Sequence, residues 1–422
     1  MSYIIFVQPT VLAIAGMDFS SVLVATCLSS AIGSVYMGLI AKYPFALAPG
    51  MGANFLFAFT VCVDQGFSWQ AALTIVFFSG ILFLLLSVFR TREKVLEIFP
   101  DCLKFALGPA IGLFIAFIGL QWSGIVVLSP ATMVTVGNFR HGVPLLSLFG
   151  VLLIVALMAR NLGGAILVGI FVTTLLGVLT GVIPLKAPEV TLRLDTFAQF
   201  NISELLQRWD EALIAIGLFF FLALFDTVGT LVGVSTLAGF MTPDNKLPRA
   251  GRAFFSDALA TCTGALLGTS TVTAYVESAT GVAAGARTGF ASLVTAACFL
   301  LAIALAPVAA VVGQDIGPEY YQSLGIEGSF VRMYPAVAPA LIVVGFLMLA
   351  PLRKVNWEDI TEGIPAFFTL GIMAFGFGIT EGIAAGCIAF AAVKTCAGRW
   401  REVHPWMYAV ALAFAARYAI LK

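Results

Sequence analysis

Long apolar runs, interrupted by short groups of Gly, Pro and charged residues, follow one another along almost the whole chain. Runs of roughly 17–25 apolar residues are long enough to cross a bilayer as helices. The pattern therefore predicts an all-α polytopic membrane protein of fourteen spans, seven in each half. The expected spans are 2–16, 20–41, 45–63, 69–90, 103–127, 144–159 and 163–183, then 211–235, 250–267, 270–286, 288–313, 335–351, 363–378 and 381–397. A further hydrophobic helix is expected at 405–420.

The third run of each half is broken. The first contains Ala48-Pro49-Gly50-Met51-Gly52, and the second begins with Thr269-Ser270-Thr271-Val272-Thr273-Ala274-Tyr275, which is rich in β-branched residues. Proline withholds a backbone donor, glycine loosens a helix, and β-branched residues favour extended backbone. We therefore expect a short extended piece before a half-helix in spans 3 and 10, with the two pieces paired.

Seven spans per half would invert the second copy relative to the first. Inverted repeats with interrupted helices at matching positions are typical of secondary transporters whose site lies near the membrane midplane. Two acids fall in this region: Asp226 lies near the middle of its apolar run, and Glu277 follows the second broken piece. A carboxylate at the bilayer centre costs about 2.5–3.5 kcal/mol on insertion scales, so both should face a site rather than lipid. Asp257, nearer a helix end, is expected to be structural.

Composition narrows the class of protein. Hydrophobic residues make up 60% of the chain and charged ones 10%, with a mean hydropathy of +1.04. Soluble domains carry about 25% charged residues, so a soluble globule is excluded. The 22 basic residues balance the 22 acidic ones, which gives no basic surface for nucleic acid. Scattered cysteines without a C-x-x-C pair and only two histidines provide neither a metal site nor a nucleophile–base pair, so neither a cofactor nor an enzyme is expected.

The distribution of Lys and Arg predicts the orientation. With the N-terminus inside, 15 of the 22 basic residues fall on the cytoplasmic side and five outside, which the positive-inside rule favours. We therefore expect a multi-pass protein of the plasma (inner) membrane with a cytoplasmic N-terminus.

Four motifs in order resemble one family. They are Ala48-Pro49-Gly50-Met51-Gly52-Ala53-Asn54, Phe225-Asp226-Thr227-Val228-Gly229-Thr230, Gly268-Thr269-Ser270-Thr271-Val272-Thr273 with Glu277-Ser278-Ala279, and Arg287-Thr288-Gly289. They resemble the purine permeases of the nucleobase–cation symporter family, in the AzgA-like branch that carries adenine, guanine and hypoxanthine. Gln8-Pro9 stands where that family normally has Asn-Pro.

The resemblance implies two inverted repeats that form a core domain and a gate domain. The core would comprise 1–127 and 211–313, and the gate 128–183 and 314–397. An external loop would occupy 184–210, and a cytoplasmic tail with its hydrophobic helix 398–422. A homodimer is implied as well.

The same resemblance implies the site. It gives Asp226, Glu277 and Asn54 as substrate-binding candidates, and Asp226, Glu277 and Glu381 as proton-coupling candidates. Beside the resemblance, the chemistry of the side chains adds Thr271, Phe221 and Phe55 as substrate-binding candidates. A purine is flat and carries donors and acceptors on its edges, which carboxyl and amide groups can match and an aromatic ring can stack on. A buried acid could also carry the coupling proton, and one proton moving down 100 mV supplies about 2.3 kcal/mol.

Other functions remain open. The same architecture could carry xanthine, uracil or another small solute. A channel is less well supported, because it would need a continuous polar lining that these apolar helices lack.

Overall fold

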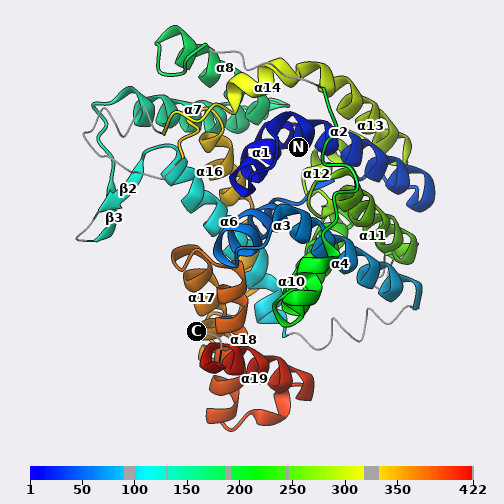
Figure 1. The fold of residues 1–422 in the computed structure, drawn as a ribbon. Helices are drawn as coiled ribbons and strands as arrows, with labels where there is room; N and C mark the ends of the chain where they lie inside the picture. The colour runs from blue at the N-terminus through cyan, green and yellow to red at the C-terminus, as the bar shows by residue number, and fades with distance from the viewer. Residues whose placement is uncertain (90–99, 130–131, 186–191, 243–246, 318–331, 421–422) are drawn as a thin grey trace. The chain divides into compact units, whose positions relative to one another are not determined.

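The computed structural model describes residues 1–89, 100–129, 132–185, 192–242, 247–317 and 332–420, and is mostly helical (Figure 1). The described residues contain seven helices long and apolar enough to cross a membrane, so the chain is a multi-pass membrane protein. They are Phe19–Ala41, Trp69–Val88, Asp101–Trp122, Gly142–Ala159, Trp209–Ser235, Phe290–Val312 and Ile379–Cys396. Shorter apolar helices accompany them, and the total of fourteen spans stays a prediction.

The chain forms two compact units. Unit 1 comprises Met1–Lys94 and Glu189–Ala309, and unit 2 comprises Val95–Pro188 and Ala310–Lys422. Each unit therefore takes one segment from each half of the chain, as expected for two repeats that each contribute to two domains.

Unit 1 contains helices from both halves around two short strands. Its elements are α1 Ile4–Leu12, α2 Phe19–Tyr36, β1 Leu47–Pro49, α3 Met51–Phe55, α4 Trp69–Phe89, α9 Ile202–Gln207, α10 Trp209–Leu237, α11 Ala250–Leu267, β4 Val272–Ala274, α12 Ser278–Ala283 and α13 Phe290–Ala302, with α14 Ala306–Val312 at the unit boundary. α2 continues as a π-helix over Met37–Ala41, and α3 over Leu56–Asp64. α4 packs on α11, and α13 packs on α2. The second helix of each repeat (α2 or α11) therefore packs against the fourth helix of the other repeat (α13 or α4).

The predicted extended pieces are confirmed. β1 pairs antiparallel with β4, with Leu47 opposite Ala274 and Pro49 opposite Val272. All six strand residues are buried, so their backbone groups need partners inside the protein. Pairing the two strands supplies part of these partners, which explains why the two interrupted segments meet.

Unit 2 is built around two helices that cross at glycines. Its elements are α6 Asp101–Trp122, β2 Val126–Ser129, β3 Met133–Val136, α7 Gly142–Ala159, α8 Ala165–Leu179, α16 Ala338–Leu347, α17 Ile360–Phe375, α18 Ile379–Cys396 and α19 Pro405–Ile420. Gly112 of α6 faces Gly345 of α16 so closely that a Cβ on Gly112 would lie 2.7 Å from the Gly345 carbonyl oxygen. α7 packs on α16, and α17 packs on α6. In unit 2, as in unit 1, helices of one repeat therefore pack against helices of the other.

The helix expected at 103–127 is α6, which belongs to unit 2 and packs there on α16 and α17. The predicted core range 1–127, which includes this helix, stays a prediction. β2 and β3 form an antiparallel hairpin that the apolar pattern did not predict. The division into core and gate domains as such stays a prediction. Arg90, Arg92, Lys94, Lys186 and Lys246, which were counted for the orientation, and parts of the loop 184–210 and of the gate segment after 317 lie outside the described residues.

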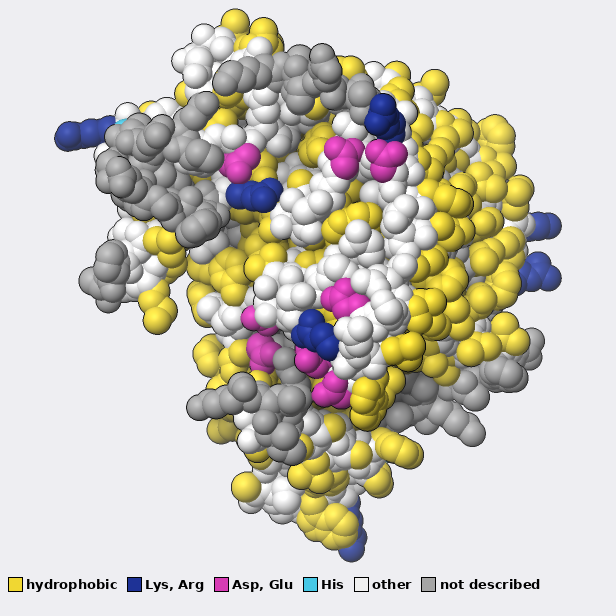
Figure 2. Space-filling model, viewed as in Figure 1, with side chains coloured by type: hydrophobic (Ala, Val, Ile, Leu, Met, Phe, Trp, Pro, Cys, Tyr) yellow, Lys and Arg dark blue, Asp and Glu magenta, His cyan; other side chains and the backbone are white. Residues whose placement is uncertain are grey.

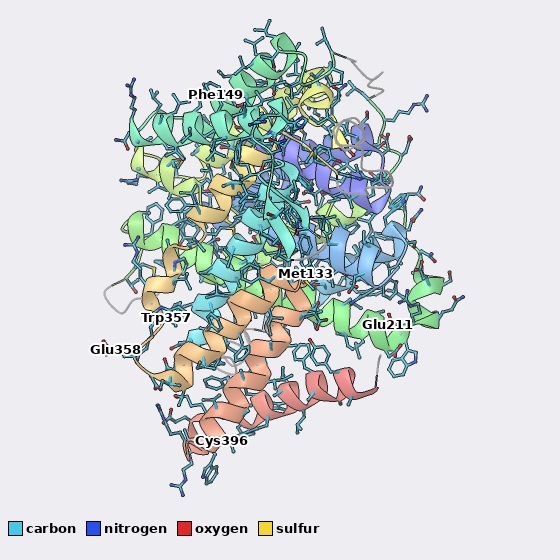
Figure 3. The ribbon with its side chains drawn as sticks, turned by 90° about the vertical axis from the view of Figure 1, so that its left-hand side faces the viewer. Met133, Phe149, Glu211, Trp357, Glu358 and Cys396 are labelled. Carbon is cyan, nitrogen blue, oxygen red and sulfur yellow. The ribbon has the colours of Figure 1, made fainter. Side chains whose placement is uncertain are left out.

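The surface of each unit is strongly apolar. On the face shown in Figure 2, hydrophobic side chains cover a broad area. The exposed hydrophobic residues of unit 1 include Leu85 of α4 and Leu301 of α13. In unit 2, Met133 and Phe149 are exposed, while Trp357 and Glu358, just before α17, lie at the same end as Cys396 of α18 (Figure 3). Such wide apolar surfaces are expected where lipid or another protein covers a membrane protein.

Candidate functional site

The two strands form the centre of the candidate site in unit 1. Beyond the ladder, Gly50 N–H donates to the Thr271 carbonyl at 2.8 Å, and Tyr275 N–H donates to the Ala46 carbonyl at 3.1 Å. The Tyr275 hydroxyl reaches across to the Pro49 carbonyl at 2.5 Å. These bonds hold the two interrupted segments together where they cross.

A hydroxyl from the preceding helix supports each strand. Ser34 of α2 donates to the Leu47 carbonyl at 3.2 Å and accepts the Leu47 N–H at 3.0 Å. Thr261 of α11 donates to the Val272 carbonyl at 3.0 Å. Because backbone groups in a membrane interior must find internal partners, these hydroxyls let the chain run extended there.

Asp226 of α10 lies against the strands. Its Oδ2 accepts the Thr273 hydroxyl at 2.9 Å. A Cβ added to Gly50 would lie 3.4 Å from the same oxygen, so the Asp226 carboxylate faces bare backbone at the end of β1. Asp226 therefore lies beside both interrupted segments.

Glu277 directly follows the second segment and precedes α12. The hydroxyl of Tyr3, the residue just before α1, donates to the Oε1 atom of Glu277 at 2.6 Å, and Glu277 is half-buried. Tyr3 is 2% exposed, and its ring lies 6.5 Å from that of Tyr275. An aromatic pair thus borders the Glu277 carboxylate.

Asn54 of α3 and Thr271 are both fully buried. Ser270 donates its hydroxyl to Asn54 Oδ1, and Ser270 together with Thr269 accepts the side-chain amide of Gln8 from α1. Asn54 Nδ2 and Thr271 Oγ1 have no hydrogen-bond partner among the described residues. Buried polar groups are nearly always bonded, so these two atoms are candidates for contact with a ligand.

Asp257 of α11 is fully buried and holds the second strand in place. It accepts the Ala274 N–H at 2.8 Å and the Thr227 hydroxyl at 2.5 Å. Both partners belong to the protein itself, which agrees with the structural role expected from the sequence.

Each of the two aromatic candidates contacts a ring of its own helix. Phe55 is fully buried and stacks on Phe59 at 5.8 Å between ring centroids. Phe221 contacts Phe220 at 5.2 Å and Phe225 at 6.4 Å. A role for either ring in binding a ligand stays a prediction.

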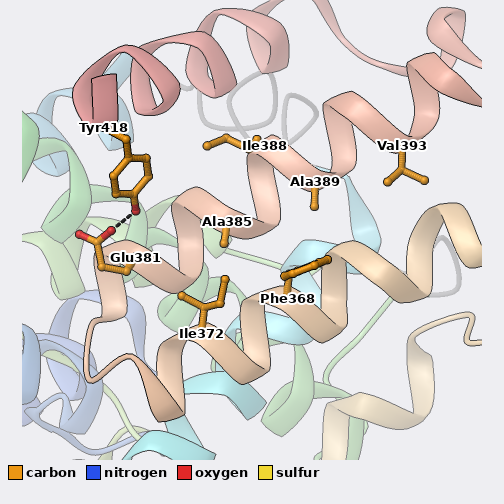
Figure 4. A pocket seen from close by; sticks show the side chains of 8 residues that line it. All are labelled: Phe368, Ile372, Glu381, Ala385, Ile388, Ala389, Val393 and Tyr418. Carbon is orange, nitrogen blue, oxygen red and sulfur yellow. Dashed lines mark hydrogen bonds between the residues drawn. The ribbon is translucent and has the colours of Figure 1, made fainter. Parts of the chain in front are cut away.

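Glu381 belongs to unit 2, apart from the other candidates, which all lie in unit 1. It sits in the first turn of α18 and accepts the Tyr418 hydroxyl of α19 (Figure 4). Both line a groove of about 580 Å³ whose other walls are apolar side chains of α17 and α18. Its role in proton coupling stays a prediction.

Sequence reasoning missed three side chains of this site: Tyr3, Gln8 and Thr273. Tyr3 and Gln8 are polar positions in the first apolar run, and Thr273 lies inside a motif already singled out. A polar residue in an apolar span was therefore the available signal. The partners of Tyr3 and Gln8 lie more than 200 positions away in the sequence and that of Thr273 lies 47 positions away, so the sequence pattern does not show which carboxyl, amide or hydroxyl group each of them contacts.

Comparisons with known proteins agree with this architecture. Residues 1–317 match the Xan_ur_permease model, described as the permease family. The guanine/hypoxanthine permease PbuG of Bacillus subtilis is 43% identical over all of this chain and 94% of its own length. The adenine permease AdeP of Escherichia coli is 41% identical over 98% of this chain and 88% of its own.

Solved structures share the fold at low identity. The transmembrane domain of the cyanobacterial bicarbonate transporter BicA has a TM-score of 0.64 at 13% identity, covering 90% of this chain and 93% of that one. The murine Solute Carrier 26 family member A9 anion transporter has a TM-score of 0.64 at 12% identity, covering 92% and 66%. The inverted-repeat transporter fold is therefore confirmed, and by its sequence the chain belongs to the permease family: it is a transporter, not an enzyme.

Proposed function

We propose that this protein is a proton symporter that imports purine nucleobases such as adenine, guanine or hypoxanthine. The observation that carries the proposal is the meeting of Asp226, Glu277 and Asn54 around the paired strands of unit 1. The names of the permeases PbuG and AdeP, which are similar over nearly the whole chain, support the choice of purines.

The chemistry of these groups suits a neutral base. An ionised carboxyl accepts ring N–H groups, a protonated one can also donate, and Asn54 has an amide donor to offer. Asp226 and Glu277 would bind the base, with Thr271, Phe221 and Phe55 completing the pocket. Two acids at one site disfavour an anion as substrate, although BicA, whose fold is similar, carries bicarbonate.

Transport would couple binding to proton movement. Asp226 or Glu277, with Glu381 in unit 2, would take up and release the proton as the core moves in an elevator or rocking motion against the gate. One proton moving down 100 mV supplies about 2.3 kcal/mol, which corresponds to roughly fifty-fold accumulation of a neutral base. In this proposal the protein is a homodimer in the plasma membrane with its N-terminus in the cytoplasm.

Uptake measurements test the proposal. Radiolabelled adenine, guanine, hypoxanthine, xanthine and uracil are supplied to a host without its own nucleobase transporters, with and without a protonophore. We expect saturable uptake of purines that the protonophore abolishes and that replacing Na⁺ by choline leaves unchanged. If none of the purines enters faster than in cells without the protein, the proposal is wrong. Purine uptake that needs Na⁺ instead would refute proton coupling alone.

A further inference from the structure

Three polar side chains form a continuous chain between α1 and α3 in unit 1. Gln8 Nε2 donates to Ser270 Oγ at 3.3 Å and to Thr269 Oγ1 at 2.8 Å, and Ser270 Oγ donates to Asn54 Oδ1. Every one of these side chains is fully buried. We call Gln8, Ser270 and Asn54 the amide chain.

In the first of two possible arrangements, Gln8 Nε2 and Asn54 Oδ1 face Ser270. An amide nitrogen only donates, so Ser270 must accept from Gln8 and pass its single hydrogen to Asn54 Oδ1. Asn54 Nδ2 and Gln8 Oε1 are then the two ends of the amide chain. Neither atom has a hydrogen-bond partner among the described residues.

The same heavy-atom positions allow the opposite direction. If both amide groups rotate by half a turn and the hydroxyls of Ser270 and Thr269 reorient, Asn54 Nδ2 donates to Ser270, and Ser270 and Thr269 both donate to the Gln8 carbonyl oxygen. Asn54 then presents an oxygen instead of a nitrogen at its free end. Both arrangements keep every bond within the amide chain, because Gln8 can act at Ser270 as donor or as acceptor.

We propose that Gln8 determines substrate range by allowing Asn54 to present either a donor or an acceptor to the base. The inference rests on the proposed function and on the role given there to Asn54. Hypoxanthine carries a carbonyl acceptor at position 6 and adenine an amino donor, so an amide that reads this edge needs opposite orientations for the two bases. Because the amide chain keeps its internal hydrogen bonds in either direction, Asn54 can present the matching group to hypoxanthine or to adenine.

Gln8→Met nearly preserves the length of the side chain but removes the amide group that lets the hydrogen bonds of the amide chain run in either direction. The Ser270 hydroxyl then has Asn54 Oδ1 as its acceptor within the described contacts, and reversing it would leave a buried O–H without a partner. Asn54 stays with its nitrogen toward the base. We expect adenine uptake to fall by about tenfold relative to hypoxanthine uptake, through a higher KM for adenine.

Ser270→Ala is the matched control variant. It removes the link itself, so the inward atom of Asn54 loses its partner in both orientations. Both uptakes should therefore fall together, with a ratio close to that of the unmodified protein. A purely structural role of the amide chain would make Gln8→Met behave in the same way.

The experiment measures KM and maximal rate for radiolabelled adenine and hypoxanthine with the full chain and both variants, normalised to the amount of protein in the membrane. Purified Gln8→Met protein is also tested for a thermal shift on adding each base. The expected result is a selective loss of adenine with Gln8→Met and no selectivity change with Ser270→Ala. Equal losses of both bases with Gln8→Met, or an unmodified protein that takes up only one of them, would overturn the inference and leave purine transport standing. An unmodified protein that takes up neither base would overturn the proposed function and this inference together.

Discussion

The Tyr3 hydroxyl donates a hydrogen bond of 2.6 Å to Glu277 Oε1, joining residues 274 positions apart. The residue just before α1 thereby reaches the acid that follows the second interrupted segment. The bond helps to orient the half-buried carboxyl group of Glu277 at the start of α12.

Tyr3→Phe removes this bond while keeping the ring. Hydrogen bonds to charged groups are worth about 1.5–3 kcal/mol, so we expect at least a tenfold loss in kcat/KM for purine uptake. Initial uptake rates over a range of base concentrations measure it. Tyr408→Phe, which removes a hydroxyl bonded to Thr395 in unit 2, is the control and should retain normal uptake. Unchanged kinetics of Tyr3→Phe would show that Glu277 needs no such orientation.

Asp226→Asn and Glu277→Gln keep the size of each side chain but remove its ability to ionise. We expect either variant to abolish purine uptake while the protein still reaches the membrane, because the base and the proton would lose the carboxyl that binds them. Radiolabelled uptake together with immunodetection in membranes tests this. Asp210→Asn is the matched control, since this exposed acid lies in the first turn of the same α10. Normal rates for both site variants would refute the assignment of the two acids.

The α6–α16 crossing depends on two glycines. A Cβ on Gly345 would lie 2.3 Å from the Gly112 carbonyl oxygen, which the backbone cannot avoid without moving. Gly345→Ala should therefore cost about 1–3 kcal/mol and lower the Tm of the protein in detergent. Gly108→Ala on α6 meets nothing within 4 Å, so its Tm should be equal or slightly higher. Equal Tm losses for the two variants would contradict close helix packing at this crossing.

A charge cluster joins the start of α17 to the end of α18; its acids Asp359 and Glu402 and its Arg399 lie outside the membrane-spanning segments, and Lys394 lies in the last turn of α18. Arg399 binds Asp359 at 2.6 Å and Glu402 at 2.7 Å, and Lys394 binds Glu402 at 2.8 Å. Hydrogen bonds from Arg399 and then Lys394 lower the pKa of Glu402 from 4.5 to about 2, and bonds from Thr361 and Arg399 lower that of Asp359 well below its usual value.

The sign of the pH effect follows from these lowered pKa values. An acid whose folded pKa is depressed stabilises the protein above its unfolded pKa and loses that contribution as the pH falls through the folded value. The cluster should therefore stabilise unit 2 fully above about pH 5 and progressively less toward pH 2. Arg399→Gln should flatten the fall of Tm over this interval, although solvent exposure keeps the effect small. A Tm profile identical to that of the unmodified protein would exclude the cluster as its source.

Local signals were sufficient for much of the fold. Pro49 and Gly50 break one apolar run and the β-branched residues from Thr271 to Thr273 break another, and both breaks are the strands of the structure. These signals act within a few residues, so they can be read without knowing the contacts. The pattern does not predict the hairpin of β2 and β3, because its apolar residues continue the apolar run of the preceding helix.

The sequence by itself determined that the chain is a membrane transporter with one interrupted segment in each half and with the acids Asp226 and Glu277 in apolar stretches, because long apolar runs and charged groups within them have large local free energies. Only the tertiary structure decided that Tyr3 meets Glu277, that Gln8 reaches Asn54 through Ser270, and that α6 joins α16 rather than unit 1. Such partners lie far apart in the chain and are chosen by packing and hydrogen bonding of the whole unit, which no local pattern encodes.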